Sequence, residues 1–133
     1  MPMIQAQIWK GSTFAIERKE GNSPGTVIFR LSGPFTARDM FSAMTPVDLR
    51  NMFEFQSMPG DEAPAVNIFD LTGVPYMDSA GLGMIVSHYV RCQAKGIRLI
   101  AAGVSPRIRE LFKITKVETF IPMAATVEEA DTC

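Results

Sequence analysis

The sequence has few residues of the kinds that hold metals, form disulfides or transfer protons. Its 133 residues include two cysteines, one histidine and one tryptophan. Cys92 falls inside a helical pattern and Cys133 is the last residue, so neither a disulfide framework nor a Cys-x-x-Cys metal site is expected. We therefore expect no cofactor and no metal, and a reducing, cytoplasmic compartment.

Clustered charge and long apolar runs are missing as well. The net charge is −1 and there is no basic run, whereas a nucleic-acid-binding surface needs clustered Lys and Arg. No apolar run approaches the roughly 20 residues that span a bilayer. Residues 1–5 also lack the charged and apolar regions of a signal peptide. We expect neither nucleic-acid binding nor direct insertion into a membrane.

What remains is the composition of an ordinary globular domain, with 47% hydrophobic and 20% charged residues. This length suits one domain over residues 1–133, with its core in about 13–130. Residues 4–9 alternate apolar and polar side chains, which is compatible with an extra N-terminal strand in a hairpin. Residues 45–64 contain Pro46 and an acidic loop with further Pro and Gly residues.

Strands and helices alternate from residue 26 onward. The predicted strands are 26–31, 66–71, 97–102 and a short edge strand at 119–123, where Pro122 removes a ladder donor. Helix starts are predicted at Thr36, Pro46, Ser79, Ser105 and Thr126. This order predicts an α/β domain with a mixed β-sheet packed against helices.

The most informative stretch is residues 74–83, between a buried strand and a helix. The pair Asp78-Ser79 lies on the turn where the strand gives way to the helix. The first amides of a helix lack intrahelical partners and the helix dipole adds partial positive charge, so a side-chain oxygen or a phosphate is stabilised there. Ser79 can therefore be a helix cap, a nucleophile or a phosphoacceptor.

These three roles make different demands on the rest of the chain. A cap needs nothing more, since Ser is common at helix starts. A hydrolase nucleophile needs Gly two residues before and after it, and Met77 occupies the first of these positions although Gly81 occupies the second. It also needs a His base, and His88 lies nine residues further along the same helix. We expect no catalytic residue. A phosphate would instead change what docks on this surface.

Residues 70–83 resemble the motif of STAS domains in anti-sigma factor antagonists. In that motif a strand ends in Asp, a short segment with an aromatic residue follows, and Asp-Ser-x-Gly opens a helix. Residues 31–35, 96–103, 105–117 and 120–122 resemble further blocks of the family in the same order. The resemblance implies a STAS-type mixed sheet packed against helices. Thr36 stands where the family often has Asp, and residues 45–64 are longer than usual.

The resemblance also implies a function that is not enzymatic. Ser79 would be phosphorylated by an anti-sigma factor that is also a serine protein kinase, and the unphosphorylated chain would bind that factor and free a sigma factor. The implied partner-binding residues are Tyr76, Met77, Asp78, Ser79, Gly81 and Gly83. The glycines would let the partner's backbone approach. The alternative is an accessory or ligand-binding subunit of a transport or stress-signalling complex.

Several other residues have more modest expected roles. Asp70, at a strand end, is expected to orient the turn by accepting amide hydrogen bonds, and Gly33 to support it. Tyr76 and Met77 are either exposed anchors or core plugs. His88 is expected at the surface or rim of its helix. Arg107 and its basic neighbours on the same predicted helix are expected to form a solvated face.

Overall fold

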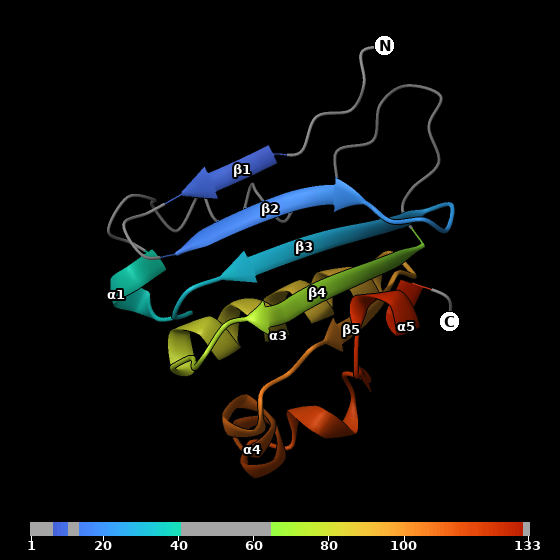
Figure 1. Cartoon of the computed structure of the whole chain (residues 1–133). Coiled ribbons are helices and arrows are strands. Elements are labelled where there is room, and N and C mark those ends of the chain that lie inside the picture. Colours follow the sequence, from blue (N-terminus) through green and yellow to red (C-terminus); the bar gives the residue numbers. More distant parts are fainter. Residues whose placement is uncertain (1–6, 11–13, 41–64, 132–133) are drawn as a thin grey trace.

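The structure, a computed structural model, describes residues 7–10, 14–40 and 65–131. Within them, six strands form one sheet whose spatial order follows the chain (Figure 1). The strands are β1 (Gln7–Lys10), β2 (Ala15–Glu20), β3 (Thr26–Ser32), β4 (Val66–Gly73), β5 (Arg98–Ala102) and β6 (Met123–Ala124). The helices are α1 (Ala37–Met40), α3 (Ser79–Ala94), α4 (Pro106–Ile114), the 3₁₀ turn η1 (Val117–Thr119) and α5 (Val127–Asp131).

The sheet is mixed, as the sequence predicts. β1, β2 and β3 pair antiparallel, whereas β3, β4, β5 and β6 pair parallel. The predicted N-terminal hairpin is confirmed by the pairing of β1 with β2. The predicted strand at 4–9 is found at residues 7–10, while its first residues, Pro46 and the segment 45–64 lie outside the described residues.

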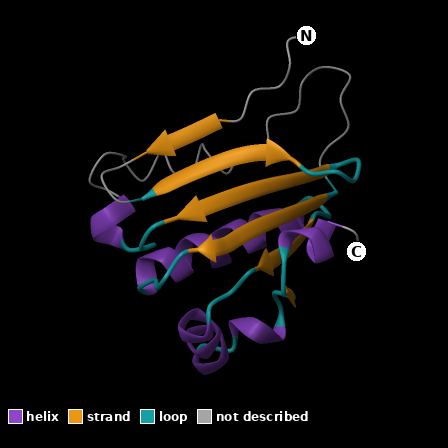
Figure 2. Ribbon diagram, viewed as in Figure 1, coloured by secondary structure: helices purple, strands orange, loops and turns teal. Residues whose placement is uncertain are grey.

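Alternation along the central strands gives the sheet two different faces. Phe29, Phe69 and Ala101 point to the face covered by α3, where the larger core cluster lies. Their neighbours Ile68 and Ile100 point to the opposite face and belong to a smaller cluster that includes a residue of α5. In Figures 1 and 2, α3 runs behind the sheet and the short α5 lies in front of it. Among the described residues, the long helix α3 covers one face and the short α5 covers part of the other.

The last predicted strand is wrong in its position. The chain at 119–121 continues the turn of η1, because the amides of Phe120 and Ile121 donate to the carbonyl oxygen of Val117. Pro122 then accepts a hydrogen bond from the amide of Ala101, and the strand itself begins at Met123. Local turn hydrogen bonds therefore take the place of strand pairing at 119–121, and β6 pairs with β5 only through Met123 and Ala124.

The prediction for His88 is also wrong. This residue is fully buried on the sheet-facing side of α3, together with Gly81, Ile85 and Cys92. The His88 Nε2 atom lies 2.8 Å from Asn67 Oδ1 of β4. Burial and, to a smaller extent, the positive charge of nearby Arg91 together lower the pKa of His88 to about 3. A neutral imidazole with an amide partner can replace an apolar residue at this contact, which composition alone does not indicate.

Candidate functional site

Two backbone hydrogen bonds join the turn before α3 to Phe35, which lies two residues before α1 begins. The amide of Phe35 donates to the carbonyl oxygen of Tyr76 at 3.0 Å, and the amide of Asp78 donates to the carbonyl oxygen of Phe35 at 3.3 Å. Met77 is 9% exposed and belongs to the main core cluster, whereas Tyr76 is 36% exposed. The alternatives for these two residues are therefore resolved differently, with Met77 as a core plug and Tyr76 at the surface.

Asp78, and not Ser79, is the residue that caps α3. One oxygen of the Asp78 carboxylate, Oδ1, accepts hydrogen bonds from the amides of Ala80 and Gly81, both at 3.0 Å. The other, Oδ2, accepts from the amide of Ala37, at the start of α1, at 3.1 Å. The carboxylate thus satisfies amides of two helices, and this negative charge lies where the helix dipole favours it. The interpretation of Ser79 as the cap is wrong.

Ser79 is consequently left with a free hydroxyl. It is the first residue of α3 and it is exposed. Within the described part of the chain, its side chain has no hydrogen-bond partner. His88, nine residues further along, is about 13 Å away along the helix axis and buried against Asn67. The hydroxyl is accessible to a partner, and the histidine that would activate it as a nucleophile is out of reach.

The two glycines after Ser79 have opposite surroundings. Gly81 is buried, and a Cβ atom added there would overlap the carbonyl oxygen of Phe35. Gly83 is exposed, and a Cβ atom added there would meet nothing within 4 Å. Gly81 therefore permits close packing within the fold, and of the two only Gly83 offers open backbone to a partner.

Asp70 and Gly33 support the edge of the sheet from which the turn leaves. Asp70 Oδ1 accepts hydrogen bonds from the amide of Thr72 at 3.0 Å and from its hydroxyl at 2.6 Å, as expected for a residue that orients a turn. Asp70 Oδ2 lies 3.8 Å from Arg30 Nε. Gly33 has φ +86°, a conformation that favours glycine, and its amide donates to the carbonyl oxygen of Gly73 at 2.9 Å.

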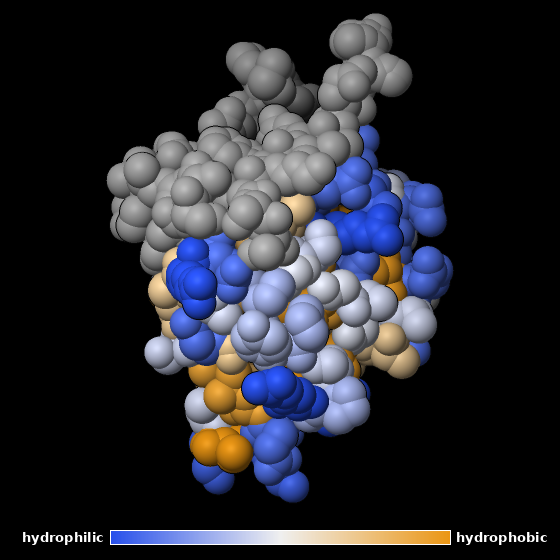
Figure 3. All heavy atoms as spheres, turned by 60° about the vertical axis from the view of Figure 1, so that its left-hand side comes forward, coloured by the Kyte–Doolittle hydropathy of each residue, from blue (hydrophilic) through white to orange (hydrophobic). Residues whose placement is uncertain are grey.

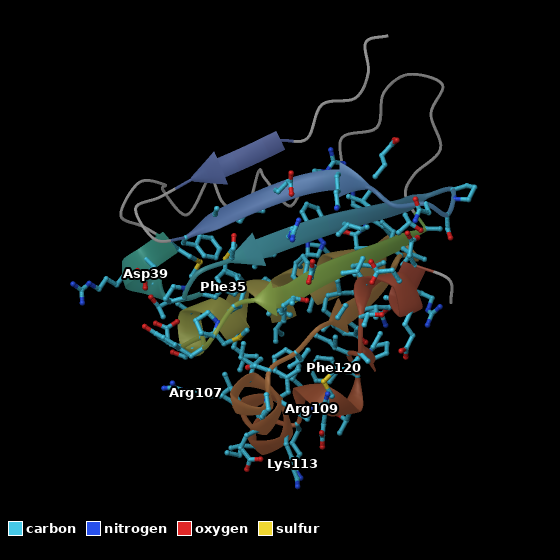
Figure 4. The ribbon with its side chains drawn as sticks, viewed as in Figure 1. Phe35, Asp39, Arg107, Arg109, Lys113 and Phe120 are labelled. Carbon is cyan, nitrogen blue, oxygen red and sulfur yellow. The ribbon has the colours of Figure 1, made fainter. Side chains whose placement is uncertain are left out.

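Thr36 retains a local role at the start of α1. Its Oγ1 atom accepts from the amide of Asp39 at 3.2 Å and donates to Asp39 Oδ2 at 2.6 Å. This confirms the predicted cap. Phe35 and Asp39 both lie close to the N-terminal end of α3 in Figure 4. The beginnings of α1 and α3 therefore form one surface around Ser79.

Helix α4 contributes a residue to this surface that the sequence does not single out. The guanidinium carbon of Arg107 lies 4.8 Å from the centre of the Tyr76 ring. Arg107 is exposed and stands in the first turn of α4. The sequence shows it only as one of four basic residues on a predicted helix, because the contact joins residues that are 31 positions apart. The face shown in Figure 3 mixes residues of intermediate hydropathy with strongly hydrophilic and hydrophobic ones.

A separate cavity of about 620 Å³ opens elsewhere on the molecule. Its charged lining residues are Lys19, Arg30, Asp70, Arg109 and Glu128. Residues 74–83 do not contribute to it. The described residues contain no group of three or more His, Cys, Asp or Glu side chains placed to hold a metal ion. No helix in the same residues combines the length and apolar character that crossing a bilayer requires.

This arrangement can be set beside known proteins. The family model of the STAS domain matches residues 16–130. The chain belongs to the STAS domain family. The match includes β2 to β6 and the turn that carries Asp78 and Ser79.

Among STAS proteins, this chain is similar to an anti-sigma-B factor antagonist of Listeria monocytogenes serovar 1/2a. The two are 40% identical over 52 residues, which are 39% of this chain and 46% of the relative. The same values hold for the anti-sigma-B factor antagonist of Listeria innocua serovar 6a. The chain thus spans about half the length of the curated relatives it matches.

Solved structures share the fold at lower identity. A sulfate transporter family protein from Wolinella succinogenes matches with a TM-score of 0.66 and 20% identity, over 83% of this chain and 84% of that one. The anti-sigma factor antagonist SpoIIAA in its unphosphorylated form matches with a TM-score of 0.56 and 19% identity, over 95% and 93%. The phosphorylated form of the Bacillus SpoIIAA matches with a TM-score of 0.57 and 19% identity, over 96% and 98%. The predicted STAS-type fold is confirmed.

Proposed function

We propose that this chain is an anti-sigma factor antagonist whose binding is switched by phosphorylation of Ser79. In the cytoplasm, the unphosphorylated chain binds an anti-sigma factor with serine protein kinase activity, and so frees a sigma factor. The observation that supports this most is the exposed Ser79 hydroxyl, which has no hydrogen-bond partner in the described structure beside a cap supplied by Asp78. The partner-binding surface comprises Tyr76, Asp78, Ser79 and Gly83, with Met77 and Gly81 supporting it from inside.

The chemistry of the switch is a phosphoryl transfer from ATP. The γ-phosphoryl group bonds to Ser79 Oγ, ADP leaves, and the hydroxyl proton is lost to the kinase or to water. The phosphate adds about −1.5 to −2 charges and three acceptor oxygens. The start of α3 tolerates a dianion, but a partner that covers it has to strip its water. Phosphorylation therefore weakens docking without needing to change the fold.

Two substitutions at Ser79 test this proposal. Ser79→Ala is expected to bind the cognate anti-sigma factor in the presence of ATP, because it cannot be phosphorylated. Ser79→Glu is expected to bind at least about 100-fold more weakly than the unmodified chain, since it buries an unpaired charge. Titration calorimetry with the purified partner measures both affinities.

A matched control adds a negative charge elsewhere on the same helix. Gln93 is exposed near the C-terminal end of α3, about 21 Å along the helix from Ser79. Gln93→Glu is expected to bind as the parent chain does. Equal affinities for Ser79→Glu and the parent chain would exclude the switch.

The cavity supports a second candidate function, that of a ligand-binding or accessory subunit of a transport or stress-signalling complex. Its cations Lys19, Arg30 and Arg109 suit a small organic anion, and its volume lies in the range of ligand pockets. Under this alternative, a nucleotide such as ATP raises the melting temperature of the parent chain by a few degrees but not that of Arg30→Gln. If ATP leaves the melting temperature of the parent chain unchanged at millimolar concentration, nucleotide binding at this cavity is excluded.

A further inference from the structure

The first turns of α3 and α4 lie at the same edge of the sheet. β4 and β5 are adjacent parallel strands, so the helices that follow them start beside each other, at the carboxyl ends of both strands. Ser79 is the first residue of α3 and Arg107 the second of α4. Two residues 28 positions apart in sequence are thereby brought to one edge.

The Arg107 guanidinium is directed at the turn that carries Ser79. It lies over the ring of Tyr76, three residues before Ser79, and three residues of chain span at most about 11 Å. In Figure 4, Arg107 extends from α4 on the side where α3 begins, whereas Arg109 and Lys113 leave the helix in other directions. The flexible arginine stem can bring the guanidinium from the ring to a phosphate on the neighbouring turn.

Among the cations at this edge, Arg107 is distinguished by its contact with Tyr76, on the turn that carries Ser79. The Asp78 carboxylate is occupied by three amides, and the Asp39 carboxylate accepts the Thr36 hydroxyl. The first turn of α3 contains no acidic residue, and α1 carries the exposed Arg38 beside Asp39. Among the described residues, no ion pair involves Arg107. Its contact with an exposed ring is the weaker kind of interaction that a charge-assisted hydrogen bond can replace.

We propose that Arg107 senses the phosphorylation state of Ser79, leaving the Tyr76 ring to pair with the phosphoserine. The proposal rests on Ser79 being the phosphoacceptor of the proposed function. In the unphosphorylated chain, the stacked Arg107 and Tyr76 present two of the three residue types that most often dominate protein interfaces, and they suit a carboxylate on the partner. In the phosphorylated chain, the phosphate takes the guanidinium, and the partner loses this anchor. The switch then combines repulsion with removal of an attractive contact.

The test measures the second ionisation of the phosphate by ³¹P NMR. Phosphoserine is placed at position 79 by genetic encoding, so that neither the kinase nor the anti-sigma factor is needed. The parent chain is compared with Arg107→Gln and with the control Arg109→Gln, which removes the same charge about 200° further around α4. A nearby guanidinium favours the dianion, so the phosphate pKa of Arg107→Gln is expected about 0.3 to 0.5 above that of the parent. Arg109→Gln is expected to match the parent.

A second readout follows Arg107 itself. In the unphosphorylated chain, the Arg107 side-chain protons lie over the Tyr76 ring and are shifted upfield by its ring current. In the chain with phosphoserine, they are expected to return toward ordinary values. Equal phosphate pKa values in the parent and Arg107→Gln, or Arg107 protons that stay upfield after phosphorylation, would overturn the proposal.

These measurements distinguish a failure of the Arg107 proposal from a failure of the proposed function. If the pKa difference appears but the chain binds no anti-sigma factor, the Arg107 contact stands and only the partner is wrong. If Ser79→Glu abolishes binding but Arg107→Gln leaves the phosphate pKa unchanged, the switch stands and Arg107 is not its sensor.

Discussion

At the scale of single residues, the site depends on how two neighbours divide their roles. Asp and Ser are both common helix caps, so a sequence cannot decide between Asp78 and Ser79. The structure assigns the cap to Asp78, whose carboxylate reaches amides of α3 and also that of Ala37. A serine hydroxyl in the capping position would be occupied by these amides. Because Asp78 caps the helix, the exposed Ser79 hydroxyl is not engaged by these amides.

The glycines at 81 and 83 give a direct test of the local packing. Gly81→Ala is expected to lower the free energy of unfolding by about 2 kcal/mol, because its methyl group overlaps the Phe35 carbonyl oxygen. Gly83→Ala is expected to raise it by about 0.5 to 1 kcal/mol, since alanine favours the helix and its methyl group meets open space. Urea unfolding of both variants measures the difference. A tolerated Gly81→Ala together with a destabilising Gly83→Ala would contradict the placement of α3.

At the scale of elements, α3 lies where the sequence predicts a helix, but the side of it that is buried differs from the predicted side. Its apolar stripe of Leu82, Val86 and Tyr89 is only partly buried, while Ile85, which is also in the stripe, is fully buried. The fully buried side includes His88, whose imidazole stacks on the Phe69 ring at 5.1 Å between ring centres. The hydropathy pattern predicts a surface position for this histidine, because the pattern contains no information about its hydrogen-bond partner Asn67 on β4.

This contact makes stability depend on pH. Burial lowers the pKa of His88 from its ordinary 6.5 to about 3, so below pH 6.5 the unfolded chain binds a proton that the folded chain does not. The contribution of neutral His88 is complete above pH 6.5 and is lost as the pH falls toward 3. Between pH 7 and pH 5, the free energy of unfolding is expected to fall by about 2 kcal/mol through this group.

Urea unfolding of the parent and of His88→Gln at both pH values isolates this effect. Glutamine does not titrate, so the free energy of unfolding of the variant is expected to change less between pH 7 and pH 5 than that of the parent. Equal pH dependence in the two chains would show that His88 is protonated freely in the folded state, and would contradict its burial.

At the scale of the whole molecule, the two faces of the sheet separate the candidate functions. The helix-covered face ends at the edge where α1, α3 and α4 begin, and this edge carries Ser79. The cavity lies apart from residues 74–83, among the ends of the central strands, α4 and the start of α5. A ligand in the cavity and a partner at Ser79 would therefore use different surfaces.

The switch is expected to change a surface and not the fold. The Ser79 side chain has no hydrogen-bond partner in the described structure, so replacing or phosphorylating it breaks no hydrogen bond of its own. For the Ser79→Glu chain, we expect the free energy of unfolding to stay within about 0.5 kcal/mol of the parent value. Its amide NMR shifts are expected to change only in the turn and in the first turns of α1, α3 and α4. Widespread shift changes across the sheet would instead indicate a conformational switch.

The sequence by itself determined the order of strands and helices, the STAS family and the turn that carries Asp78 and Ser79. These follow from local patterns, because apolar runs, caps and short motifs act between residues close in the chain. The tertiary structure decided which of the two residues caps α3, which glycine is buried, where His88 points and that Arg107 reaches Tyr76. Each of these depends on contacts between segments distant in sequence, which form only when the parallel strands bring them to one edge or one face of the sheet.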